Sequence, residues 1–257
     1  MRTLSHWPLA QRQRIQGVLT DIDDTLTCEG AIAPDALQAL HQLKSAGYAV
    51  IAITGRPVGW STPFAQAWPV DAIVAENGAV ALLGQRKLYL QDANTRQHNH
   101  ARMQAVMQHV LQTVPGAHAS HDSNGRETDI AIDHSEFHHL AEDEIARVVH
   151  LMQDAGMNAT VSSIHVNGWF GSHNKLEGAR WIVRELFQRD LDAELDAWAY
   201  VGDSTNDQLM FAHFANSVGV ANIQRFVPTL QHLPRYVTPS ERGTGFSEVA
   251  QALLASR

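Results

Sequence analysis

Several features are scarce or missing in this sequence, and each absence narrows its possible roles. Its 257 residues include a single cysteine, Cys28, so no internal disulfide can support the fold, and a reducing compartment is expected. No apolar run approaches the roughly 18 residues needed to cross a bilayer, and the first 15 residues lack the continuous apolar segment of a signal peptide. Positively charged residues are also fewer than negatively charged ones. The 19 Lys and Arg and 27 Asp and Glu give a net charge of −8. These features favour a cytoplasmic protein, a monomer or homodimer, that binds neither nucleic acid nor membranes.

The first and last thirds of the chain alternate between short apolar runs and helix-length amphipathic stretches. The pattern predicts a helix from Pro34 to Gly47, with Leu37, Leu40 and Leu43 on one stripe, and another over 175–187. Alternation of this kind is typical of an α/β protein whose parallel sheet is covered on both faces. The predicted buried strands are 17–22, 48–53, 71–75, 197–201, 217–220 and 236–238.

The middle third has a different pattern. Apolar residues recur with helical spacing over 103–111 and 145–152. Residues 128–133 and 160–166 instead alternate between apolar and polar, which predicts strands with one wet face. We therefore expect a small α+β layer, residues 92–169, inserted into a larger domain formed by residues 1–91 and 170–257.

Three carboxylates follow the first predicted strand, in Asp21-Ile22-Asp23-Asp24-Thr25. Carboxylates at the end of a buried strand repel one another and lose hydration, so they need a cation or protonation. Open α/β sheets keep their sites at the carboxyl ends of their strands. A functional site is therefore favoured over a plain acidic turn.

A second acidic motif, Gly202-Asp203-Ser204-Thr205-Asn206-Asp207, follows another predicted strand and opens a helix. Its two aspartates are four residues apart and can point to one side. Simple helix capping by Asp203 or Ser204 is the alternative when the motif stands alone. Paired with Asp21 and Asp23, it offers oxygen ligands of the kind that Mg²⁺ prefers.

Two further segments carry weaker signals. Ile53-Thr54-Gly55-Arg56-Pro57 joins a strand to a helix, and a hydroxyl beside a helix N-terminus can bind an anion, although such turns are common. Lys175 lies in the first turn of a predicted helix, where its charge opposes the helix dipole. That position indicates either a role elsewhere or an ordinary solvated lysine.

In order and spacing, these four segments resemble the motifs of the haloacid dehalogenase superfamily of phosphohydrolases. The matching positions are Asp21, Asp23 and Thr25 for the first motif, Thr54 for the second, Lys175 for the third, and Gly202, Asp203 and Asp207 for the fourth. Glu76-Asn77-Gly78, before an apolar hairpin, resembles subfamily IIB, whose cap lies between the second and third motifs. Sucrose-phosphate, trehalose-phosphate and mannosyl-phosphoglycerate phosphatases belong to that subfamily. Asp24 departs from the pattern, since many members have glycine there.

The resemblance implies a Rossmann-like core, the inserted cap and a mechanism. Asp21 would be the nucleophile and Asp23 the general acid and base. Mg²⁺ would be held by Asp21, Asp203 and the backbone carbonyl of Asp23, and Lys175 would neutralise further charge. Thr54 would bind a phosphate oxygen. Asp207 and Asn206 would lie outside the metal ligands and would orient Lys175 or metal-bound water.

Candidates for substrate binding are weaker. Arg56 is close to the phosphate turn. If the strand ending near residue 166 continues, His165, Asn167 and Trp169 share one face, which would suit a sugar ring or be a plain sheet face with an interdomain tryptophan. The fifteen histidines are scattered without a zinc-binding pattern, and no Walker or dinucleotide motif is present.

The sequence thus predicts a Mg²⁺-dependent phosphomonoester phosphatase that acts on a small phosphorylated metabolite. The subfamily resemblance favours a sugar or glycosyl phosphate. Two alternatives stay open, namely a phosphomutase of the phosphomannomutase type and a non-hydrolytic switch phosphorylated on Asp21.

Overall fold

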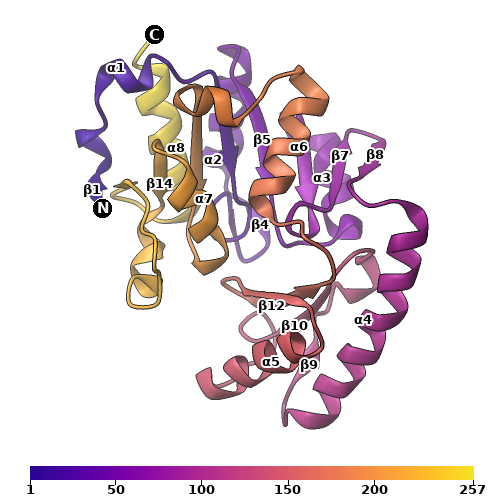
Figure 1. Ribbon diagram of the computed structural model, residues 1–257. Helices are drawn as coiled ribbons and strands as arrows, with labels where there is room; N and C mark the ends of the chain where they lie inside the picture. Colours follow the sequence, from indigo (N-terminus) through magenta and orange to yellow (C-terminus); the bar gives the residue numbers. More distant parts are fainter.

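The computed structural model describes residues 1–257, the whole chain, and contains two bodies with a sheet each (Figure 1). The larger body is built on a nine-stranded sheet in the order β1-β15-β14-β13-β2-β5-β6-β7-β8. Along this order, every neighbouring pair from β1 to β6 is parallel. The pairs β6–β7 and β7–β8, at one edge of the sheet, are antiparallel. The strands are β1 (Arg2–Thr3), β2 (Gly17–Thr20), β5 (Ala49–Ile53), β6 (Ala72–Ala75), β7 (Val80–Leu83), β8 (Arg86–Tyr89), β13 (Trp198–Gly202), β14 (Ser217–Gly219) and β15 (Tyr236–Val237).

The central strands are continuous apolar runs because both faces of the sheet are covered. Val18 of β2 packs into a cluster of 30 buried residues on one face, and its neighbour Leu19 packs into a cluster of 17 on the other. Gly17 is required at the start of β2, since a Cβ there would lie 2.3 Å from the ring of Trp198 on β13. The α/β class predicted from the sequence is confirmed.

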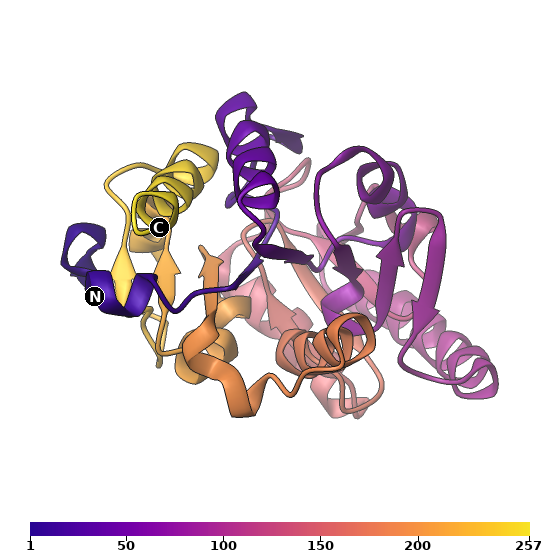
Figure 2. The same ribbon diagram turned by 90° about the horizontal axis from the view of Figure 1, so that it is seen from above.

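Helices cover both faces of this sheet, as Figure 2 shows from above. The N-terminal α2 and the C-terminal α8 pack together on one face, and α6 and α7 cover the other. The helices of the larger body are α1 (Leu9–Arg12), α2 (Pro34–Ser45), α3 (Val58–Ala67), α6 (Lys175–Phe187), α7 (Gln208–His213) and α8 (Arg242–Leu254). Short 3-10 turns are η1 (Leu4–His6), η2 (Glu76–Gly78), η4 (Asp192–Ala197), η5 (Thr205–Asp207) and η6 (Ala221–Phe226), and a small hairpin pairs β3 (Thr27–Cys28) with β4 (Ala31–Ile32).

The smaller body holds a separate antiparallel sheet in the order β11-β12-β10-β9. Two helices pack on it and bury a third apolar cluster, which includes Met103, Val148 and Trp169. Its elements are α4 (Ala93–Thr113), β9 (His118–Ala119), η3 (Ser123–Gly125), β10 (Ile130–Asp133), α5 (Glu142–Asp154), β11 (Asn158–Val161) and β12 (His165–Trp169). Two linkers, after β8 and after β12, join it to the larger body (Figure 1). We propose 92–169 as the bounds of this inserted body, which we call the cap.

The single strand predicted over residues 160–166 is wrong. Residues 162–164 form a turn between β11 and β12, which pair antiparallel with Val161 opposite Val166. Ser162 stabilises the turn, because its hydroxyl accepts hydrogen bonds from the amides of Ile164 and His165. Apolar residues on both sides of the turn imitate one alternating strand, and no glycine or proline marks the break.

None of the helices combines the length and apolarity needed to span a bilayer.

Candidate active site

The ends of three adjacent strands bring the main motif residues together. The sheet places β2 between β13 and β5. Asp21 directly follows β2, Thr54 follows β5 and Asp203 follows β13. Since the strands are parallel, these residues meet at one edge of the sheet, and all three side chains are buried.

Lys175 lies at the start of α6 and connects two of the buried carboxylates. Its Nζ lies 2.8 Å from Asp21 Oδ1 and 2.7 Å from Asp207 Oδ1. It also donates to Asn206 Oδ1 at 3.2 Å. Burial alone would lower the pKa of Lys175, but Asp207 and Asp21 outweigh it and raise that pKa above its usual value. The lysine is therefore a fixed positive charge beside Asp21 rather than a solvated side chain.

Asp207 has no free acceptor capacity. One of its oxygens, Oδ1, takes the contacts from Lys175 and the hydroxyl of Tyr200. The other, Oδ2, accepts the amides of Asp203 and Ser204 at 2.9 and 3.0 Å. Gly202 allows this packing, because a Cβ there would lie 2.5 Å from Asp207 Oδ2. Asp207 thus holds Lys175 and the loop that carries Asp203.

The remaining acidic groups fit a divalent cation. Carboxylate oxygens of Asp21, Asp203 and Asp207 lie within 4.8 Å of one another. Burial raises the pKa of Asp21 to about 7, opposed by Lys175 and reinforced by Asp207 and Asp23. Burial and the neighbouring carboxylates also raise the pKa of Asp203 well above its usual value. Because Asp207 already accepts four hydrogen bonds, Asp21 and Asp203 are the two carboxylates of the cluster that could hold a divalent cation such as Mg²⁺.

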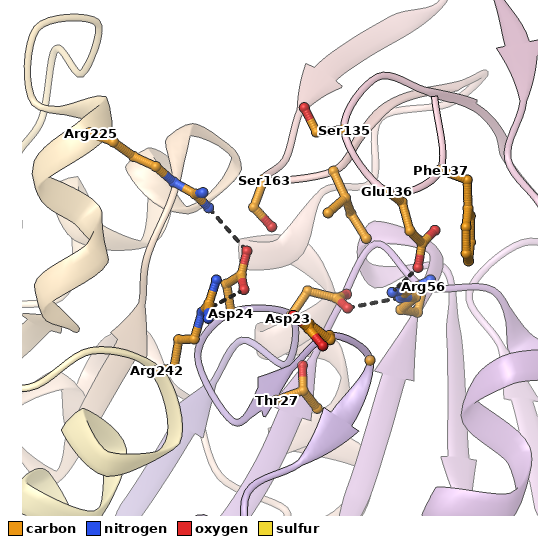
Figure 3. A pocket seen from close by; sticks show the side chains of 13 residues that line it. Asp23, Asp24, Thr27, Arg56, Ser135, Glu136, Phe137, Ser163, Arg225 and Arg242 are labelled. Atoms are coloured by element: carbon orange, nitrogen blue, oxygen red, sulfur yellow. Dashed lines mark hydrogen bonds and ion pairs between the residues drawn. The ribbon is translucent and has the colours of Figure 1, made fainter. Parts of the chain in front are cut away.

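Asp23 lines a cavity between the two bodies (Figure 3). Arg56 Nε donates to Asp23 Oδ1 at 2.8 Å, and the Thr54 hydroxyl lies 3.4 Å from Asp23 Oδ2. The cavity has a volume of about 490 Å³. Ser135, Glu136 and Ser163 of the cap line it opposite Asp23. We call it the reaction cavity.

Arg56 is almost fully buried, and its three nitrogens are all engaged. Besides Asp23, it contacts two carboxylates of the cap, Asp122 at 3.2 Å and Glu136 at 2.7 Å. Its guanidinium also lies 4.9 Å from the ring centre of Trp60. A role in binding substrate stays a prediction, and the visible partners of Arg56 are protein carboxylates.

The three strand residues predicted to bind substrate lie in different surroundings. His165 Nε2 lies 2.9 Å from Glu136 Oε2, so it supports a residue of the reaction cavity. Asn167 donates to the carbonyl of Gly55, in the phosphate turn. Trp169 packs in the cap core and lines a second cavity instead. The structure therefore does not bring the three together around one ligand space.

Sequence reasoning missed several residues that line the reaction cavity. Glu136 lies in a loop held by Asp133, whose carboxylate accepts four amides, those of residues 135–138. An aspartate followed by polar residues at a strand end is a signal for such a loop. Arg225 and Arg242 each lie 3.0 Å from an oxygen of Asp24, one on each side (Figure 3). The sequence signal for these arginines is Asp24 itself, a carboxylate at a position where the superfamily often has glycine.

A buried carboxylate joins the two bodies beside the site. Glu76, in η2 of the core, is fully buried and accepts a hydrogen bond from the amide of Val58 at 3.0 Å. From the cap it accepts the amides of Glu127 and Thr128 and the hydroxyl of Thr128. Three of the four groups that donate to Glu76 thus belong to the cap, which is closed over the strand ends.

Comparisons with known proteins agree with this architecture. Residues 18–114 match the model of the haloacid dehalogenase-like hydrolase family. None of the curated proteins compared matches the chain. Among solved structures, the sucrose-phosphatase from Synechocystis sp. PCC6803, solved with sucrose and phosphate, has a TM-score of 0.67 and 14% identity, covering 93% of this chain and 98% of that one. The C-terminal domain of the trehalose-6-phosphate phosphatase from C. albicans has a TM-score of 0.70 and 14% identity, covering 99% and 98%. A HAD subclass IIB sugar phosphatase has a TM-score of 0.64 and 16% identity, covering 93% and 98%.

The chain shares the overall fold of these structures, and its own buried Asp21 and Asp203 lie at the carboxyl edge of the parallel sheet. Residues 18–114 therefore resemble the haloacid dehalogenase-like hydrolases, and the chain as a whole shares its fold with these phosphatase structures.

Proposed function

We propose that the chain is a Mg²⁺-dependent phosphomonoester hydrolase that forms a phosphorylated aspartate on Asp21. The observation that carries the proposal is the contact of Asp21 with Lys175 at 2.8 Å, with Asp23 two residues along the chain facing a cavity. One carboxylate is held beside fixed positive charge, and the other faces the space for a leaving group. That division suits a nucleophile and a general acid.

Asp21 attacks the phosphorus, and the ester oxygen leaves toward the reaction cavity. Asp21, Asp203 and the backbone carbonyl of Asp23 would hold Mg²⁺, which would supply positive charge beside the phosphoryl oxygens. Lys175 neutralises charge from its own side, and Thr54 donates its hydroxyl to a phosphoryl oxygen. Asp207 keeps Lys175 in place through the 2.7 Å contact.

Asp23 donates a proton to the leaving oxygen and then removes one from the water that hydrolyses the phosphorylated Asp21. Arg56 orients the carboxylate through the 2.8 Å hydrogen bond to Asp23 Oδ1. The cap closes the space, which limits competing reactions with bulk water.

The substrate we propose is a small sugar or glycosyl phosphate. The reaction cavity, of about 490 Å³, is large enough for such a group, and only two of its 13 lining residues are hydrophobic. The names of the similar structures, a sucrose-phosphatase and a trehalose-6-phosphate phosphatase, support this class.

Phosphate release from a panel of phosphomonoesters tests the proposal, with Mg²⁺ or with EDTA. We expect release that depends on Mg²⁺ and falls by at least 10³-fold in Asp21→Asn, because the amide is not a nucleophile. Asp143→Asn, an exposed aspartate on α5, is the matched control and keeps full activity. Release that survives in Asp21→Asn contradicts the proposal.

The same assay separates the two alternatives. A phosphomutase needs a bisphosphate activator and yields an isomer instead of phosphate. A switch accumulates the phosphorylated aspartate without turnover. The position of Asp23 at the cavity favours hydrolysis over the switch, because an acid and base beside the phosphorylated residue speeds its loss.

A further inference from the structure

The reaction cavity is lined by three arginines, and each of them is paired with a carboxylate of the protein. Arg56 is held by Asp23 and by two carboxylates of the cap. Arg225 and Arg242 lie at the other end of the cavity, each 3.0 Å from a different oxygen of Asp24 (Figure 3). The three arginines are the only basic residues of the lining, so the cavity offers no cation without a partner to an anionic group of a ligand.

The two arginines beside Asp24 are placed where a ligand can reach them. Their side chains are 45% and 37% exposed, whereas that of Arg56 is 4% exposed. Arg225 comes from η6, and Arg242 is the first residue of α8. Paired guanidinium groups bind carboxylates and phosphates well, provided that their charge is free. Whether a ligand finds that charge free depends on Asp24.

Asp24 is fixed in its position between the arginines. Its side chain is 13% exposed, and its backbone carbonyl accepts a hydrogen bond from Nδ2 of Asn222 at 3.0 Å. Its φ of 54° lies in the left-handed region, which residues other than glycine seldom adopt, and Arg242 has a φ of 52°. Two unfavourable backbone conformations thus hold this ion pair at the cavity, and such strain is typical of functional positions.

We propose that Asp24 is a specificity-determining residue, which occupies the two arginines and thereby excludes leaving groups that carry a negative charge. The inference rests on the proposed hydrolysis and narrows its substrates to phosphomonoesters with an uncharged leaving group. A carboxylate or second phosphate on the ligand has to displace Asp24 from both arginines and then lies beside its carboxylate, which repels it. The hydroxyls of Ser135 and Ser163 remain for an uncharged leaving group. The same repulsion acts on a bisphosphate, which counts against the phosphomutase.

Two substitutions of Asp24 test the role of its charge. Asp24→Asn removes the charge with little change of shape, and asparagine tolerates the left-handed backbone. Asp24→Gly removes the whole side chain and relieves the backbone strain. Glu29→Gln is the matched control, because Glu29 is an exposed carboxylate that lines the same cavity, has a φ of 50° and is paired with no arginine.

Two pairs of ligands differ in one anionic group. In 3-phosphoglycerate a carboxylate replaces the terminal hydroxymethyl group of glycerol 1-phosphate, and fructose 1,6-bisphosphate has one phosphate more than fructose 6-phosphate. Titration calorimetry with Mg²⁺ measures their affinities for the full chain carrying Asp21→Asn, which leaves the esters intact. We expect this protein to bind the less charged member of each pair at least about tenfold more tightly. Adding Asp24→Asn or Asp24→Gly should reduce that preference at least about tenfold for one pair, and adding Glu29→Gln should not.

The arginines are tested by adding Arg225→Gln and Arg242→Gln to Asp24→Asn, which should restore weak binding of the more charged ligand. Tight binding that persists in this combined variant overturns the proposal. An unaltered preference in both Asp24 variants also overturns it, as does an equal change in Glu29→Gln, a starting protein without the preference, or no binding of either charged ligand by Asp24→Gly. Affinity does not depend on turnover. Failure of the proposed hydrolysis is therefore seen separately, as the absence of phosphate release from every ester by the wild type.

Discussion

Replacing Asp21 by asparagine should make the metal-free protein more stable, by an amount that grows with pH. The pKa of Asp21 is raised from 3.8 to about 7, chiefly by burial. The unfolded chain therefore loses this proton more readily than the folded one, so rising pH destabilises the folded state from about pH 4 until the carboxyl of the folded state has ionised. The penalty is about 2 kcal/mol at pH 5 and about 4 kcal/mol at pH 8.

Asparagine does not titrate, so this pH-dependent penalty is absent in the variant. The weaker contact of asparagine with Lys175 lowers the free energy of unfolding by the same amount at pH 5 and pH 8, because Lys175 stays charged at both. The stability of the variant relative to the wild type should thus rise by about 2 kcal/mol between pH 5 and pH 8. Urea unfolding of both proteins in EDTA at the two pH values measures this difference. Saturating Mg²⁺ should stabilise the wild type more than the variant, since it binds the ionised carboxylate. A difference that does not change with pH would refute the reasoning that burial outweighs Lys175 at Asp21.

Three further predictions concern other parts of the molecule. Lys175→Met should abolish phosphate release and lower the metal-free stability by about 3–5 kcal/mol, seen in urea unfolding, because it removes the positive charge that two buried carboxylates share. Arg56→Lys should slow hydrolysis of alkyl phosphates at least tenfold more than that of p-nitrophenyl phosphate, because orienting Asp23 matters most for a poor leaving group; equal losses on both esters contradict that role. Gly17→Ala should lower the free energy of unfolding by about 1–3 kcal/mol, because its methyl group meets the ring of Trp198, and an unchanged melting temperature would show that the strands separate easily.

The core of the fold could be predicted because its signals are local. Buried parallel strands are continuous apolar runs, so the strand before Asp21 and the one before Asp203 are visible in the sequence. The carboxyl-end rule then places both aspartates at one edge without any structure. The spacing of Asp203 and Asp207 follows from a single turn, in which Asp207 accepts the amide of Asp203.

The rest depends on how two bodies dock, which a linear pattern does not contain. Glu136 reaches Arg56 across 80 residues of chain, and Arg225 reaches Asp24 across 201. A lone charged residue in a loop carries no signal for a partner so far away. The hairpin at residues 162–164 was missed for a different reason, because Ser162 supplies the turn with its side chain and needs no glycine.

Glu76 has a consequence for the timing of the reaction. Separation of the two bodies breaks three of the four hydrogen-bonding contacts of Glu76, whose carboxylate is buried from water. Each opening of the cap therefore costs the free energy of these contacts. For the proposed hydrolysis, we therefore expect the cap to stay closed during most of each catalytic cycle. Release of the dephosphorylated product, rather than cleavage of the bond to phosphorus, should be rate-limiting.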